Sequence, residues 1–248
     1  DGSDPGGGWR AQREAVKPPQ PDAAPAVVNW TEHGEGRSAR WRSESGSPPP
    51  GRVTIADDRL TADAAYRLAS EGTALLWRGD FQNARQLLQA MARRIDRTPR
   101  KAAATPIEAF NFHRQHQSRR ARTLGMLLLP LEADYGIALR RAPNVKEACA
   151  EAYGTGKEAS IVSLRELLGV IGAHEWRKKG VDIAVLGDRI HPHYGVFSPV
   201  RGEYLQLVAR APLPSSALAF DIGTGTGVLA ALLARRGIRH VVATDRDP

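Results

Sequence analysis

Residues 217–248, ALAFDIGTGTGVLAALLARRGIRHVVATDRDP, decide the fold class that the sequence predicts. The run 217–221 is short, apolar and ends in an acid, which is typical of a buried parallel strand. Residues 228–236 are rich in Leu and Ala and precede a glycine, which predicts a helix. Residues 240–244 predict a second strand. Strand, helix and strand in this order open a doubly wound sheet, so the predicted fold class is α/β.

The turn after the first strand carries the candidate cofactor site. Three glycines alternate there with threonines, so the chain can turn sharply and present backbone amides and small hydroxyls to a ligand. An acid follows the second strand about 20 residues later, where a carboxylate can accept hydrogen bonds from ribose hydroxyls. The candidate cofactor-binding residues are Asp221, Gly223, Thr224, Gly225, Gly227 and Asp245.

Two cofactor classes fit this turn. The pattern Gly225-x-Gly227-x-x-Ala230 satisfies the dinucleotide fingerprint, which predicts an NAD(P)-dependent oxidoreductase. The longer pattern, which begins at Asp221 and includes all three glycines, resembles motif I of the class I S-adenosylmethionine-dependent methyltransferases. Acids at strand ends suit a cationic sulfonium, whereas a pyrophosphate favours their absence. S-adenosyl-L-methionine is therefore the expected cofactor, and the oxidoreductase is the alternative.

The resemblance extends upstream, over roughly residues 190–248. Residues 194–204 resemble the segment before motif I in small-domain methyltransferases related to the release-factor glutamine methyltransferases. The resemblance implies a Rossmann-like sheet, a cytoplasmic bacterial-type enzyme, and methyl transfer to a planar nitrogen of a protein or nucleic acid. Tyr194, Phe197 and Arg201 are the candidates for the substrate entrance. The relatives carry an Asn-Pro-Pro-aromatic motif after their fourth strand, so the catalytic residues are expected beyond residue 248 and the chain is expected to be truncated.

The rest of the chain divides into two predicted regions. Residues 1–52 are dominated by Gly, Pro, Ser, Arg and acids without sustained periodicity, which predicts a disordered tail. Residues 53–180 show helical spacing and repeated capping signals, which predict an all-helical domain for substrate recognition. The capping signals begin at Thr61, Asp80, Thr105, Asn144 and Ser163.

Basic residues concentrate in the predicted helices between residues 93 and 141. This window holds 11 basic and 4 acidic residues, in a chain whose net charge is +8. Arg114, Arg119, Arg120 and Arg122 could meet RNA phosphates or an acidic protein, or could form a solvated helical face. A non-catalytic RNA- or ribosome-binding module is therefore the third function that the sequence allows.

Residues 181–197 predict a β-hairpin that precedes the glycine-rich unit. His191 and His193 lie there without a nearby cluster of acids or cysteines, so no metal site is predicted. The single cysteine, Cys149, excludes an internal disulfide and fits a reducing cytoplasm. The longest apolar run, residues 126–131, is too short to span a bilayer, so no membrane partner is expected.

Overall fold

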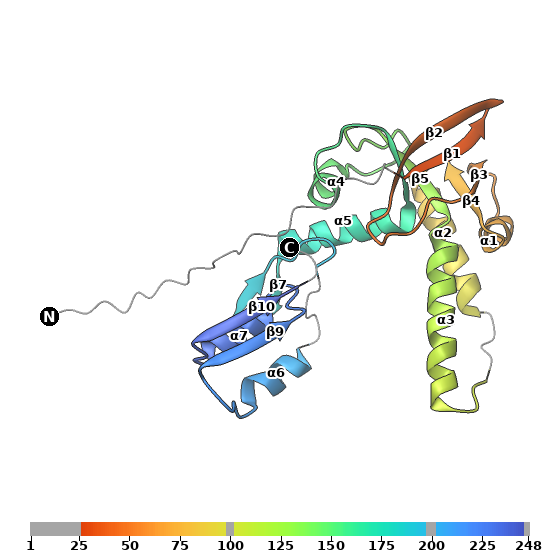
Figure 1. Ribbon diagram of the computed structural model, residues 1–248. Coiled ribbons are helices and arrows are strands. Elements are labelled where there is room, and N and C mark those ends of the chain that lie inside the picture. Colours follow the sequence, from red (N-terminus) through yellow and green to blue (C-terminus); the bar gives the residue numbers. More distant parts are fainter. Residues whose placement is uncertain (1–25, 98–101, 197–201, 246–248) are drawn as a thin grey trace.

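The computed structural model describes residues 26–97, 102–196 and 202–245 (Figure 1). The described chain is mixed α/β and falls into an N-terminal part, residues 26–179, and a C-terminal part, residues 181–245, each with its own apolar core. The α/β class that the sequence predicts is confirmed. A complete doubly wound sheet stays a prediction, because the parallel unit described in the C-terminal part has two strands.

A six-stranded mixed sheet forms the centre of the N-terminal part. In spatial order its strands are β1 (Val27–Glu32), β2 (Glu35–Arg42), β6 (Ser160–Ser163), β5 (Leu127–Leu131), β4 (Thr73–Trp77) and β3 (Arg52–Ala56). Strands β3, β4 and β5 run parallel, β6 is antiparallel to β5 and parallel to β2, and β1 pairs antiparallel with β2. The helices of this part are α1 (Ala62–Ser70), α2 (Phe81–Arg97), α3 (Pro106–Leu124), α4 (Lys146–Tyr153) and α5 (Leu164–Lys179).

The prediction that residues 53–180 are all-helical is wrong, because four of the strands, β3 to β6, lie in this range. Strands β4, β5 and β6 are short runs whose side chains are mostly buried on both faces of the sheet, whereas the edge strand β3 is only partly buried. Leu75 and Leu76 of β4, for example, are both fully buried. A strand of this kind shows no alternation of polar and apolar residues, so periodicity cannot distinguish it from a buried helical segment.

The predicted disordered tail is also wrong for the residues that the structure describes. Residues 1–25 lie outside the described part, whereas β1 and β2 form a hairpin at one edge of the sheet. Its two-residue turn has positive φ at both His33 (55°) and Gly34 (83°), which matches the twist of antiparallel strands. Most of its side chains are exposed, and Val28 and Trp41 are its buried apolar residues, which is why the composition resembles that of a coil.

Several predicted helices are confirmed at their caps. Thr61 accepts a hydrogen bond from the Ala64 amide (3.3 Å) and begins α1, and Thr105 accepts one from the Glu108 amide (3.2 Å) and begins α3. The predicted cap at Asn144 is displaced by one residue, since Val145 precedes α4. The helical spacing of apolar residues in α2 forms a stripe that is buried in the core and consists of Phe81, Ala84, Leu87, Leu88, Met91 and Ile95.

Glu32 connects the hairpin to the loop after β4. Its carboxylate accepts hydrogen bonds from Arg78 Nε (2.9 Å) and Nη2 (2.7 Å) and from the Trp30 indole (3.0 Å). The hydrogen bond from Arg78 lowers the pKa of Glu32 to about 2. Because the folded pKa lies below the ordinary value of 4.5, the stabilisation is present above pH 4.5 and is lost as the pH falls towards 2.

Replacing Glu32 with glutamine should therefore flatten the fall in the free energy of unfolding between pH 4.5 and pH 2. Urea titrations of the two proteins at several pH values would measure this difference. Arg78→Gln should produce the same flattening, since it removes the other partner of the same ion pair. Parallel pH curves for the wild type and both variants would contradict the assignment.

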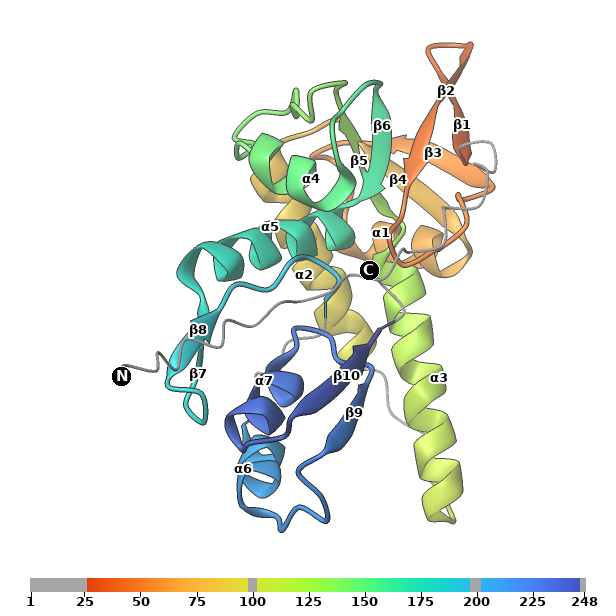
Figure 2. The ribbon, with the colours of Figure 1, turned by 60° about the vertical axis from the view of Figure 1, so that its left-hand side comes forward.

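The C-terminal part contains both units that its sequence predicts. The hairpin is formed by β7 (Val181–Ile183) and β8 (Asp188–Ile190), and α6 (Glu203–Arg210) precedes β9 (Leu218–Ile222), α7 (Val228–Arg235) and β10 (His240–Thr244). Strands β9 and β10 are parallel. Helix α7 covers one face of this pair (Figure 2), where Leu205 of α6 packs with Val228 and Leu232.

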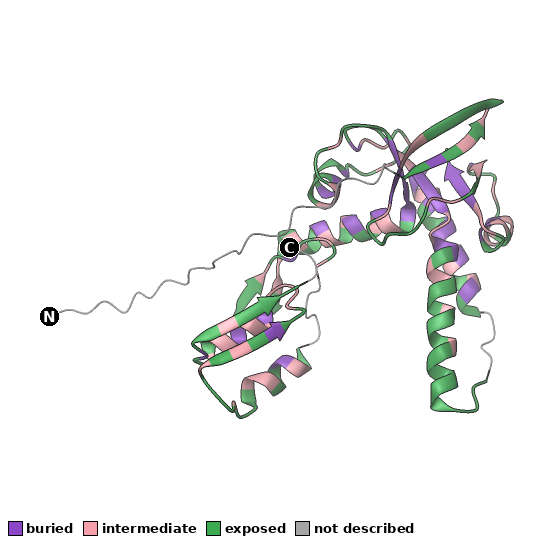
Figure 3. Cartoon of the chain, in the orientation of Figure 1, coloured by how far each residue is buried: buried purple, intermediate pink, exposed green. Residues whose placement is uncertain are grey.

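The opposite face of β9 and β10 is exposed and apolar (Figure 3). Phe220 and Ile222 of β9 are 62% and 83% exposed, and Leu218 and Val242 are also exposed. Parallel strands are normally covered on both faces. Among the described residues, nothing covers Leu218, Phe220 and Val242, whereas Val241 is half-buried.

Candidate cofactor site

Asp221 lies at the carboxyl end of β9, and its side chain is directed into the glycine-rich turn. The residue is 6% exposed, and its Oδ2 atom accepts hydrogen bonds from the Thr224 hydroxyl (2.7 Å) and the Ala230 amide (3.0 Å). Ala230 belongs to the first turn of α7, where backbone amides lack helical partners and the helix dipole favours a negative charge. The carboxylate therefore holds the turn against the start of the helix.

The three glycines allow the turn its conformation. Gly223, Gly225 and Gly227 have φ values of 76°, 52° and 76°, in the left-handed region that side chains disfavour. Gly227 is the N-cap of α7 and has no side chain, so the Asp221 carboxylate takes the capping role at the Ala230 amide. The amides of Gly223 and Thr224 donate to the Thr244 carbonyl (2.8 and 3.0 Å), which fixes the turn beside the end of β10.

Asp245, at the end of β10, closes the site from the other strand. Its Oδ2 atom accepts a hydrogen bond from the Gly225 amide (2.6 Å), so the predicted residues of the two strand ends meet at the turn. Asp245 is exposed, and a carboxylate offers about four lone-pair positions. It could therefore accept further hydrogen bonds from a ligand that enters from the solvent.

Tyr204 of α6 is a neighbour of this site to which the sequence assigned no role. Burial raises the pKa of Tyr204, and the negative charge of Asp221 raises it further. Tyr204 also packs against the apolar cluster beneath α7. Tyr204 is the last residue of the segment 194–204, which resembles the methyltransferases. This resemblance was the one sign in the sequence that Tyr204 could belong to the site.

Of the three candidates for a substrate entrance, the one that the structure describes does not lie at the turn. Tyr194 packs against the core of the N-terminal part, next to Gly169 of α5. Burial, followed by the charge of Glu166, raises the pKa of Tyr194 to about 12. Phe197 and Arg201 lie outside the described residues.

The basic window divides into paired and unpaired arginines. Arg140 and Arg141 both donate to Asp80 (3.0 and 2.7 Å), and Arg120 donates to Asp96 (3.0 Å). The other predicted arginines, Arg114, Arg119 and Arg122, are exposed on α3 and form no ion pair with a described residue. Helix α3 extends well beyond the sheet (Figures 1 and 2), so its outer surface is open to a partner.

The remaining chemical candidates do not form a site. Among the described residues no three His, Cys, Asp or Glu side chains gather as metal ligands, and the ring of His191 contacts the Arg177 carbonyl (2.5 Å). Cys149 is buried, and its burial raises the thiol pKa to about 11, so it is not a ready nucleophile. No helix in the described ranges is long and apolar enough to cross a bilayer.

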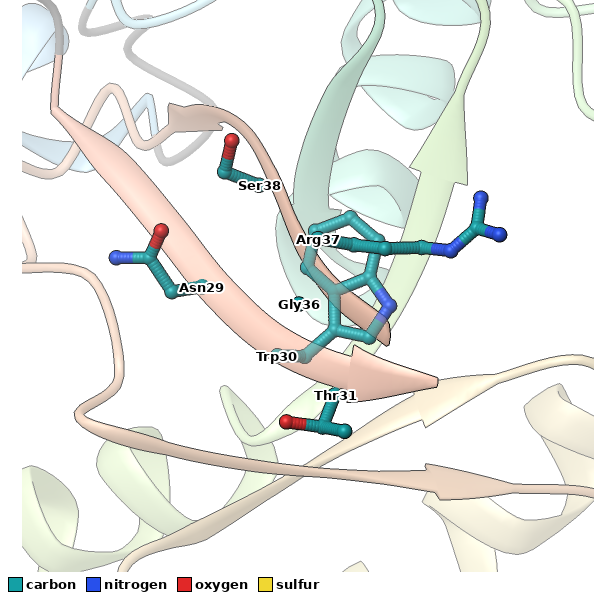
Figure 4. Close-up of a pocket in the computed structure, with 6 residues that line it drawn as sticks. All are labelled: Asn29, Trp30, Thr31, Gly36, Arg37 and Ser38. Carbon is teal, nitrogen blue, oxygen red and sulfur yellow. The ribbon is translucent and has the colours of Figure 1, made fainter. Parts of the chain in front are cut away.

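A shallow hollow of about 460 Å³ lies on the hairpin of the N-terminal part (Figure 4). Asn29, Trp30 and Thr31 of β1 and Gly36, Arg37 and Ser38 of β2 line it. None of the candidate cofactor residues contributes to this hollow, so it is separate from the glycine-rich turn.

A scan against protein-family models and a search of curated proteins found no match to the chain.

Proposed function

We propose that the protein is an S-adenosylmethionine-dependent methyltransferase whose cofactor binds at the turn between β9 and α7. The observation that carries the proposal is the position of Asp221, whose carboxylate accepts the Ala230 amide at the start of α7. A dinucleotide fold leaves such amides for the pyrophosphate of its ligand. At this turn a pyrophosphate would meet a carboxylate instead, whereas a sulfonium cation would be attracted to it.

The residues of the turn have distinct roles in this proposal. Asp221 and residues 223–227 hold the methionine portion, and Asp245 accepts hydrogen bonds from the ribose hydroxyls. The bound cofactor supplies an activated methyl group, and the protein contributes mainly the alignment of that group with its acceptor. A planar nitrogen of a protein or nucleic acid is the proposed acceptor, on the basis of the resemblance of residues 190–248 alone.

Titration calorimetry of the chain with four ligands tests the cofactor class. S-adenosylmethionine and its demethylated product should both give heats of binding, whereas NAD and NADP should give none. The reason is the charge at the helix start, which discriminates between a sulfonium and a pyrophosphate. Binding of a nicotinamide dinucleotide without binding of either sulfur ligand would overturn the methyltransferase and favour the oxidoreductase.

A second function, contact with RNA, is favoured by α3. Arg114 and Arg119 lie exposed on this projecting helix, and the Arg114 guanidinium lies over the Phe110 ring (5.8 Å). Phe110 is itself 60% exposed. Exposed aromatic rings and arginines together can stack on bases and neutralise phosphates of single-stranded RNA.

Reversing Arg114 and Arg119 to glutamate should abolish the binding of a single-stranded RNA oligomer at low salt. For two phosphate contacts on a single strand, the logarithm of the affinity should fall against log salt with a slope of roughly −1.4. The matched control reverses Arg59 and Arg67, which are exposed elsewhere, and should leave binding unchanged. Fluorescence anisotropy measures both quantities, and equal loss in the control pair would show that net charge alone is responsible.

A further inference from the structure

We propose that a cavity at the start of α5 binds a nucleoside monophosphate or a closely similar phosphate monoester. The cavity measures about 570 Å³ and lies where β2 and β6 end and where β3, β4 and β5 begin. The proposal is independent of the proposed methyl transfer, because no residue of the glycine-rich turn lines this cavity.

The cavity lies at the edge of the sheet where parallel α/β folds less often bind a ligand. Parallel α/β folds bind their ligands at the carboxyl ends of the strands. In the N-terminal part that edge is occupied by the protein's own side chains, since Asp80 follows β4 and pairs there with Arg140 and Arg141. The opposite edge carries the cavity, with Ser163, Arg165 and Arg122 in its wall.

Ser163 supplies the first indication of a ligand. It precedes α5 and is 8% exposed, yet its Oγ atom has no hydrogen-bond partner among the described residues. The spacing to Glu166 predicts a capping box, but Ser163 makes no capping hydrogen bond, and Glu166 accepts from the Glu44 amide and the Tyr153 hydroxyl (3.1 Å each). A buried hydroxyl without a partner is costly, and a ligand oxygen in the cavity would satisfy it.

The charges around Ser163 select an anion. The side chains of Arg122 and Arg165 line the cavity, and neither forms an ion pair with another described residue. The first turn of α5 faces the same space, and its free amides and dipole favour negative charge. Glu166 is the one acid in the wall, its carboxylate already accepts two hydrogen bonds from within the protein, and the two arginines outnumber it.

The rest of the wall suits the organic portion of the ligand. Three consecutive prolines, residues 48–50, and Met126 give an apolar surface, and the loop that carries the prolines is held by a hydrogen bond from the Trp41 indole to the Ser47 carbonyl (2.7 Å). Ser43, Ser45 and Ser47 add a row of hydroxyls joined by hydrogen bonds of 3.0 Å. A phosphate on a sugar with a planar base matches this combination of cationic, hydroxyl and apolar walls.

Titration calorimetry with AMP, CMP, GMP and UMP tests the proposal on the full chain. At least one nucleotide should bind at micromolar concentrations, and the corresponding nucleoside and inorganic phosphate should each bind at least tenfold more weakly. Replacing Arg122 and Arg165 together with alanine should weaken binding at least tenfold. Arg119→Ala, on the same helix but outside the wall, should leave the affinity unchanged.

Ser163→Ala separates a ligand role from a structural one. It should weaken nucleotide binding three- to tenfold while leaving the melting temperature of the free protein unchanged or raised, because it removes an unpartnered buried hydroxyl. Asp245→Ala should leave nucleotide affinity unchanged. The proposal is overturned if no nucleotide binds at 1 mM, or if Asp245→Ala abolishes binding while the arginine pair does not, since the nucleotide would then occupy the glycine-rich turn.

Discussion

Replacing Asp245 with alanine should lower the affinity for S-adenosylmethionine by roughly thirty-fold or more. In the proposed mode of binding, the variant removes two charge-assisted hydrogen bonds to the ribose hydroxyls, which together would contribute about 2–4 kcal/mol. Asp245 suits this test because it is exposed, unlike Asp221, whose buried carboxylate also holds the turn against α7. Titration calorimetry at constant pH and salt measures the change.

Two control variants show whether a loss of affinity in Asp245→Ala comes from the lost contact with the cofactor. Asp245→Asn keeps an acceptor for the Gly225 amide and should lose less affinity than the alanine variant. Asp188→Ala removes an exposed acid from the hairpin of the same part and should have no effect. An Asp245→Ala protein that binds the cofactor with wild-type affinity would place the ribose elsewhere.

Replacing Asp80 with alanine should lower the melting temperature of the N-terminal part by roughly 5–10 °C, because it removes both a helix cap and the buried carboxylate that two exposed arginines bind. The Asp80 side chain is fully buried and accepts hydrogen bonds from the amides of Gln82 (2.8 Å) and Asn83 (3.4 Å) at the start of α2. It also accepts from Arg140 and Arg141 of the segment that follows β5. Differential scanning calorimetry measures the shift.

The stability that the ionised Asp80 side chain contributes should decrease as the pH falls. The hydrogen bond from Arg141, followed by that from Arg140, lowers the pKa of Asp80 well below its ordinary value of 3.8. The ionised group therefore stabilises the fold above about pH 4, and the stabilisation is lost as the pH falls further. Asp80→Asn, which can still cap α2, should be less destabilised than the alanine variant at pH 7, and its difference from wild type should narrow below pH 4. An Asp80→Asn protein that melts at the wild-type temperature at pH 7 would mean that the charge contributes nothing, whereas equal melting temperatures for the two variants would mean that the cap contributes nothing.

The candidate cofactor site could be predicted because its residues are close in sequence. Asp221, the glycines and Asp245 span a single strand–helix–strand unit, so local spacing contains most of the geometry. The cavity at Ser163 and the network at Asp80 could not be predicted in this way. They join segments that are distant in sequence, as in the 60 residues that separate Asp80 from Arg140.

The N-terminal sheet was missed for a related reason. Strand β5 has the sequence LLLPL, and a proline is unusual in a central strand because it cannot donate a ladder hydrogen bond, although the structure pairs Pro130 with Ile161 of β6. Strand β6 has four residues and runs directly into α5. Helix α2, in contrast, is amphipathic over 17 residues, so its buried stripe is visible in the sequence alone.

The uncovered face of β9 and β10 has a consequence for the distribution of stability along the chain. The C-terminal core rests on a small cluster around Leu205, Val228 and Leu232, whereas the N-terminal core extends across a whole sheet. Backbone hydrogen bonds that are shielded on one side only open at a lower free energy than those inside a large core. The turn that would hold a cofactor thus lies in a segment that opens at a lower free energy than the N-terminal sheet, and a ligand bound there would raise the local opening energy of the entire strand pair.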